Sequence, residues 1–218
     1  MTHRTVMGLF SGALLATLVL GCGSDSSTPT QPAPSLEVSP PFVGLLEGST
    51  VQMTATIDDA AVPVTWASDN TAAATVSATG LVTGVGGGFA AITATLTSDA
   101  TQLRSASVTV TAPPALTSGV PVTGLGSTGA RGSTVLYKIV VPAGKTQLRV
   151  TLSGGTGDVD LYLRAGTPPT VSSFTCASEN GGNIEACTIT NPAAGTWFVL
   201  LALWDPYAGV TLTGTITP

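Results

Sequence analysis

The sequence predicts an all-β protein, with two β-sandwich domains in tandem after a signal peptide and a flexible tether. Three features of the 218 residues support this. Charged residues are only 9% of the chain, Thr and Gly are abundant at 36 and 26 residues, and apolar residues alternate with hydroxyl residues over many short stretches. Helical bundles need Ala, Glu, Lys and Leu in quantity. Thr and Val in short runs, separated by Gly-containing turns, are typical of strands.

The charge and His content exclude several function classes. Seven Lys and Arg face twelve Asp and Glu, so no basic stripe is available to neutralise phosphates, and no nucleic-acid partner is expected. The single His is His3, inside a segment that we expect to be removed. Without it, the mature chain has no His for Ser–His, Cys–His or His–zinc chemistry.

Residues 1–22 are expected to be a secretory signal. After a short basic start at His3 and Arg4, residues 6–20 are apolar or small, a stretch too short for a comfortable membrane span. The segment ends Leu-Val-Leu-Gly-Cys at Cys22 and resembles the bacterial lipobox, in which the Cys is acylated. An ordinary signal peptide with an incidental Cys is the alternative. The resemblance implies lipid anchoring at Cys22, and Gly23 favours the outer membrane or cell surface.

Residues 23–34 are rich in Ser, Thr and Pro and are expected to form a disordered tether, which spans at most about 40 Å. The other two Cys residues, Cys176 and Cys187, have ten residues between them. Export favours a disulfide between them in this turn-rich segment, and two free thiols are the alternative.

Residues 35–112 predict the first sandwich. Apolar and hydroxyl residues alternate in 51–57, 90–96 and 106–111, as in half-buried strands with a hydroxyl-bearing outer face. Asp, Asn and Gly turn signals separate the runs, which is typical of a sandwich. Six acids and one base, Arg104, give this region a net charge of −5.

This region resembles the bacterial immunoglobulin-like group 2 domain. The resemblance is carried in order by the segments 64–70 (Val-Thr-Trp-Ala-Ser-Asp-Asn), 74–77, 80–85 and 88–94. It implies a β-sandwich of the kind found on bacterial surface proteins, often as a spacer. Trp66 is expected to fill the core of this sandwich.

A short Pro-Pro-Ala linker at 113–115 precedes the second region, 116–218, in which five acids balance five bases. Alternation returns over 135–141, 148–152 and 159–163. A final pair of strands is expected around 197–203 and 210–216, with a turn between them.

The second region resembles the bacterial pre-peptidase C-terminal domain. The matching segments include Val-Pro-Ala-Gly at 141–144, Gly-Asp-Val-Asp-Leu-Tyr at 157–162, Gly-Thr-Trp-Phe-Val at 195–199 and Tyr-Ala-Gly-Val-Thr-Leu at 207–212. The resemblance implies a β-sandwich appended to secreted peptidases and other exported proteins. It also implies a likeness to collagen-binding domains of collagenases, some of which bind calcium and insoluble polymers.

Asp158 and Asp160 are the strongest candidates for a polar functional site. Residues two apart on a strand share a face, about 6.5–7 Å from each other. With backbone carbonyls they would suit a hard cation such as calcium, for which Glu179 and Glu185 are candidate further ligands. Capping of a turn is the favoured structural alternative, and a catalytic carboxylate dyad is a third reading.

Three aromatic residues form the best candidate for a ligand-binding surface. Trp204 and Tyr207 flank the expected turn at Asp205-Pro206, and Tyr162 should face away from the core. Exposed aromatics stack on sugars or peptide side chains. The alternative is that these side chains only cover an edge of the sandwich.

Together these features predict a non-catalytic cell-surface lipoprotein. Its C-terminal sandwich would bind an extracellular polymer or protein, polysaccharide or collagen-like, with calcium as the candidate cofactor. The first domain would act as a spacer. A purely structural spacer or assembly subunit without a ligand is the alternative. An accessory part of a secreted hydrolase system, or a hydrolase using Asp158 and Asp160, is the least favoured function.

Overall fold

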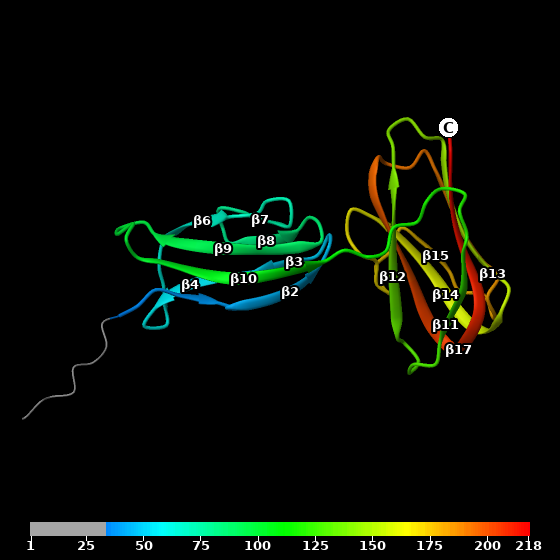
Figure 1. Cartoon of the computed structure of the whole chain (residues 1–218), viewed down its shortest axis with the longest axis horizontal. Coiled ribbons are helices and arrows are strands. Elements are labelled where there is room, and N and C mark those ends of the chain that lie inside the picture. The colour runs from blue at the N-terminus through cyan, green and yellow to red at the C-terminus, as the bar shows by residue number, and fades with distance from the viewer. Residues whose placement is uncertain (1–33) are drawn as a thin grey trace, which may run out of the picture. The chain divides into compact units, whose positions relative to one another are not determined.

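The computed structural model describes residues 34–218, which fold entirely into strands, turns and loops (Figure 1). The all-β prediction is therefore confirmed. The predicted signal segment with Cys22, and the tether up to residue 33, lie outside the described residues. Within 34–218 the chain forms no helix long and apolar enough to cross a membrane.

The first sandwich contains ten short strands in three sheets, ordered β1-β4-β5, β2-β10-β9-β6 and β3-β8-β7. The strands are β1 (Glu37–Ser39), β2 (Phe42–Leu46), β3 (Thr50–Gln52), β4 (Thr54–Ile57), β5 (Ala60–Ala61), β6 (Val64–Ser68), β7 (Ala74–Val76), β8 (Leu81–Gly84), β9 (Gly88–Leu96) and β10 (Leu103–Thr111). Strand β2 runs parallel to β10, and the other pairings are antiparallel.

The period-two pattern explains how this sandwich packs. On β9 and β10 the apolar residues, such as Ile92 and Val108, are buried. The intervening Thr and Ser residues lie on the outer face, where Thr93 and Ser105 are hydrogen-bonded across the two strands. Trp66 packs against this core but is only partly buried, so it fills the core less completely than predicted.

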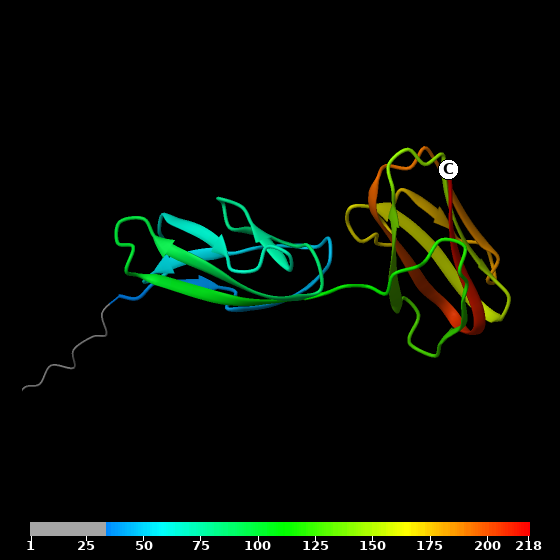
Figure 2. The same cartoon turned by 45° about the horizontal axis from the view of Figure 1, so that its top comes forward.

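The second sandwich contains seven strands. They are β11 (Val122–Ser127), β12 (Thr134–Val141), β13 (Gln147–Ser153), β14 (Thr156–Ala165), β15 (Cys176–Ser178), β16 (Glu185–Thr190) and β17 (Gly195–Thr217). The long strand β17, orange to red in Figure 2, belongs to both layers. Its first half pairs with β12 and β14, and its second half pairs with β11 and β13.

The prediction of two final strands with a turn between them is wrong, because β17 continues through 204–209 without interruption. The chain bends there by a bulge instead. Pairing with β14 shifts register between Asp158↔Asp205 and Thr156↔Ala208. Bulges let a strand pass from one layer to the other, and Pro206 is tolerated at such a position because its missing N–H breaks no regular ladder bond.

The core of this sandwich lies between the two layers. Val159, Leu161 and Leu163 of β14 point into it and are completely buried, together with residues such as Val210 and Leu212 of β17. The alternate residues of β14 therefore face outward. That outer face of β14 carries the candidate site.

Candidate functional site

A pocket of about 370 Å³ lies on the outer face of β14, lined by Asp158, Asp160, Tyr162, Glu179, Gly181 and Trp204. The first three alternate along β14, and Trp204 follows from the neighbouring strand β17. Glu179 and Gly181 come from the loop between β15 and β16. Five predicted or suggested site residues are thus brought to one place: both Asp residues, Tyr162, Glu179 and Trp204.

Tyr162 lines the pocket but is not exposed. Only 3% of its surface is accessible, and it packs with Leu200 and Ala202 in a small apolar cluster outside the main core. Its hydroxyl donates a hydrogen bond of 2.7 Å to Glu179 Oε1. Burial and this bond raise the pKa of Tyr162 far above its ordinary value. Tyr162 thus faces away from the core as predicted, but it holds Glu179 and offers no free stacking face.

Asp160 is a half-buried carboxyl group of the pocket. Its pKa is raised to about 6, chiefly by burial and further by the negative charges of Asp158, Glu179 and Glu185, while the positive charge of Arg131 opposes the shift. Burial and like charges both disfavour the ionised form. Asp160 is therefore ionised at neutral pH but takes up a proton in mildly acidic solution.

Asp158 is not the turn cap that was the favoured alternative. Its Oδ1 atom is buried and has no hydrogen-bond partner among residues 34–218. Caps work because the side-chain oxygen accepts from nearby backbone N–H groups, and Oδ1 accepts from none. A buried acceptor without a donor is costly, and this oxygen belongs to a residue that lines the pocket.

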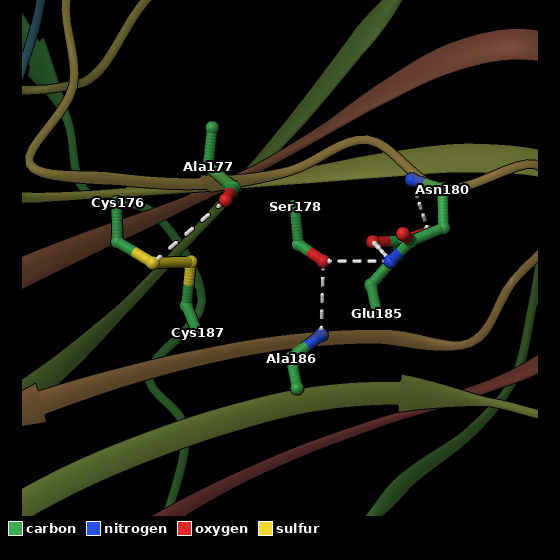
Figure 3. Close-up of a disulfide and its surroundings, with 7 residues drawn as sticks. All are labelled: Cys176, Ala177, Ser178, Asn180, Glu185, Ala186 and Cys187. Carbon is green, nitrogen blue, oxygen red and sulfur yellow. Dashed lines mark hydrogen bonds between the residues drawn. A yellow bond between two sulfur atoms is a disulfide. The ribbon is translucent and has the colours of Figure 1, made fainter.

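The loop that carries Glu179 is held by the predicted disulfide between Cys176 and Cys187, which is confirmed (Figure 3). The two Cα atoms are 5.9 Å apart. Beside it, Glu185 is 1% exposed and accepts two hydrogen bonds of 3.0 Å from Asn180, one from the backbone N and one from Nδ2. Glu185 thus braces the loop and does not line the pocket, contrary to its suggested role as a ligand.

Trp204 is exposed over 49% of its surface, in agreement with the prediction of an accessible aromatic. The guanidinium of Arg131, in the loop between β11 and β12, lies over its ring with Cζ 3.0 Å from the ring centroid. Sequence reasoning missed Arg131. It lies 73 positions from Trp204, and no local pattern links the two.

Tyr207 does not belong to this surface, and its predicted ligand role is wrong. It is 4% exposed and packs in the main core beside residues such as Val210. Residues three apart on an extended strand face opposite sides. Because β17 runs through as a strand, Trp204 points outward and Tyr207 points inward.

The pocket does not have the donor set of a metal centre. Within the part of the chain that the structure describes, no group of three or more His, Cys, Asp or Glu side chains is placed to hold a metal ion. The calcium site at Asp158 and Asp160 therefore stays a prediction, without a third side-chain ligand to support it. The pocket instead combines carboxylates with an exposed indole, which suits a cation or an organic ligand.

The chain thus contains two β-sandwiches, and the second of them carries this site. Family models identify each of them: residues 32–112 match the bacterial Ig-like domain (group 2), and residues 133–202 match the bacterial pre-peptidase C-terminal domain. The chain thus contains these two domains in the predicted order. Both are non-catalytic accessory domains.

Part of this chain is similar to part of several other proteins, two of which are named as proteases. The "Extracellular protease" of Xanthomonas campestris pv. campestris is 46% identical over 97 residues, which are 44% of this chain and 16% of that protein. The "Zinc metalloprotease" of Helicobacter pylori is 41% identical over 111 residues, which are 50% of this chain and 42% of that protein. The structure described as "Solution structure of vEP C-ter 100" is 39% identical, with 46% and 96% coverage and a TM-score of 0.38. The chain spans less than half the length of these curated relatives.

Proposed function

We propose that this is an exported, non-catalytic surface protein. Its C-terminal sandwich binds an extracellular polymer or protein, polysaccharide or collagen-like, and the first sandwich is a spacer. The two domain families support this, as does the similarity to a protein named as an extracellular protease. A lipid at Cys22 would anchor it to the outer membrane or cell surface. Mass spectrometry of the mature N-terminus tests that anchor, and an unmodified Cys22 would contradict it.

The half-exposed indole of Trp204 beside the acidic pocket carries the binding proposal. Exposed Trp side chains are enriched at binding sites because a large rigid ring is buried at little cost in conformational entropy. Both sides of the pocket rest on fixed elements, the strands β14 and β17 and a loop closed by a disulfide. A site held in this way loses little entropy on binding.

Retention of the full chain on insoluble collagen, peptidoglycan and polysaccharides tests this proposal. We expect retention on at least one of them, and a loss of about fivefold or more for the Trp204→Ala variant. Phe89→Ala is the matched control, since Phe89 is a 75% exposed aromatic of the first sandwich. Absence of retention on every polymer would favour the alternative, a spacer without a ligand.

A further inference from the structure

The pocket carries an excess of negative charge. The carboxylates of Asp158, Glu179 and Glu185 all act on Asp160, and only the guanidinium of Arg131 opposes them. Charges gathered in a partly closed site interact more strongly than they do in bulk water. A cationic ligand would relieve this repulsion, whereas an anionic one would add to it.

One oxygen inside this charged site also lacks a partner. Asp158 lines the pocket, and its Oδ1 atom is buried without a hydrogen bond. A ligand that brings an N–H donor would satisfy this acceptor. The charge of the pocket and its unpaired acceptor therefore both favour a ligand with a positively charged N–H donor.

Trp204 selects an organic cation over a metal ion. Its indole lines the same pocket, and the guanidinium of Arg131 already lies over its ring. Trp gives the strongest cation–π contact of the aromatic side chains, and guanidinium groups are the most frequent partners. The contact between Arg131 and Trp204 is thus a cation–π contact of the kind that a cationic ligand would make with the same ring.

We propose, on the basis of the binding function proposed above, that this pocket binds an arginine side chain of a polypeptide partner. The guanidinium would lie between the Trp204 indole and the carboxylates of Asp158 and Asp160. Arg131 competes for the same indole and swings away when the ligand enters. Arginine fits better than lysine, because its planar fork presents several donors to a carboxylate and stacks on a ring.

Calorimetric titration of the full chain with a hexa-arginine peptide at low ionic strength tests this proposal. Hexa-arginine should bind more tightly than hexa-lysine, and hexa-glutamate should not bind. We expect Trp204→Ala and Asp160→Asn each to weaken hexa-arginine binding by about fivefold. Arg131→Ala should strengthen it by about threefold, since this change removes both a competitor and a positive charge. A merely structural Arg131 would give no such gain.

Two matched controls accompany these variants. Glu37→Gln removes one negative charge from an exposed strand position of the first sandwich, and Phe89→Ala removes an exposed ring there. Neither should change binding by more than the error of the titration. Circular dichroism of every variant verifies that it is folded.

Three results would overturn the proposal: equal binding of hexa-glutamate, unchanged binding in the Trp204→Ala variant, or weaker binding in the Arg131→Ala variant. Failure of hexa-arginine to bind, together with polymer retention that depends on Trp204, would overturn this inference and leave the proposed function standing. Failure of both experiments would overturn both.

Discussion

Asp160 links the stability of the second sandwich to pH. Its pKa is raised to about 6, first by burial and then by neighbouring carboxylates. The folded state therefore holds a proton that the unfolded state, with a pKa near 3.8, has already lost. Since stability falls with rising pH where the folded state binds more protons, the group's favourable contribution is complete below about pH 4. It is lost as the pH rises towards 6.

The Asp160→Asn variant should consequently be more stable than the natural protein at pH 7.5, by about 1 kcal/mol after allowance for solvent screening. This gain should shrink to nothing near pH 4. Urea unfolding of both proteins across this range measures it. A gain that is the same at both pH values would show that the ionised carboxylate is not its source. The same change should weaken hexa-arginine binding, as expected where a residue is kept for binding at the expense of stability.

The sequence was sufficient to predict the site residues that lie on the same face of a single strand. Period-two alternation along β14 was enough to place Asp158, Asp160 and Tyr162 on one face, away from Leu161. It could not find Arg131, which tertiary packing brings to Trp204 from a distant loop. It also could not tell that Tyr162 would be covered by its neighbours, because accessibility depends on side chains from other strands.

At the scale of elements, the bulge of β17 explains the predictions around Pro206. The chain is irregular there, as predicted, but it does not form the predicted turn between two strands. The sequence Asp205-Pro206 predicts a turn between Trp204 and Tyr207, because Asp and Pro are frequent in turns. Pairing with β14 and β11 keeps the segment extended and takes up the irregularity as register shifts. The domain order and most of the strands followed from local pattern, whereas this continuity depended on long-range pairing.

Gly157 is required where β14 passes this bulge. Its φ is +89°, and a Cβ atom there would collide with the backbone of Pro206 and Tyr207. Gly157→Ala should therefore destabilise the sandwich by about 3 kcal/mol or more, from the strained φ and the clash together. Gly144→Ala is the matched control, since Gly144 has a φ of +76° and open space around its Cβ position. Its cost should be about 1 kcal/mol. Equal losses in urea unfolding would contradict the role of the close backbone approach.

The disulfide stabilises the strand pair β15 and β16 and the loop between them. Cys176 and Cys187 are 11 positions apart, and a loop of this length predicts a stabilisation of about 3 kcal/mol. Replacing both residues by Ala should lower the free energy of unfolding by about that amount. It should also weaken hexa-arginine binding, because Glu179 is carried by the loop. Chemical unfolding with and without a reductant provides the comparison. No effect of the reductant on the natural protein, with complete reduction verified by thiol counting, would argue against a stabilising bridge.

At the scale of the whole chain, the net charge of each sandwich does not indicate which of them carries the acidic pocket. The first sandwich has a net charge of −5, and its acids are spread over several strands and turns. The second is neutral by count, yet three of its five acids, Asp158, Asp160 and Glu179, line one pocket. A summed charge bears on solubility and long-range attraction. Recognition depends on where the charges gather, and this favours the second sandwich as the binding domain.

The two sandwiches have separate cores. One core consists of buried residues between Leu36 and Val110, and the other of buried residues between Leu116 and Leu212, with no member in common. A domain with its own apolar core can unfold as a cooperative unit. Calorimetry of the full chain should therefore show two transitions, each sensitive to its own core.

Ile92→Ala and Leu161→Ala test this separation, since both residues are completely buried, one in each core. Each loss should cost about 3 kcal/mol, which lowers the melting temperature of a domain of this size by roughly 10 to 20 °C. Ile92→Ala should shift one transition and leave the other in place, and Leu161→Ala should do the reverse. Hexa-arginine should raise the melting temperature of the second sandwich only, which is the transition that Leu161→Ala shifts. The reason is that a ligand stabilises the domain that binds it. If either substitution shifted both transitions equally, the two sandwiches would form one cooperative unit, and the first would do more than hold the binding domain at a distance.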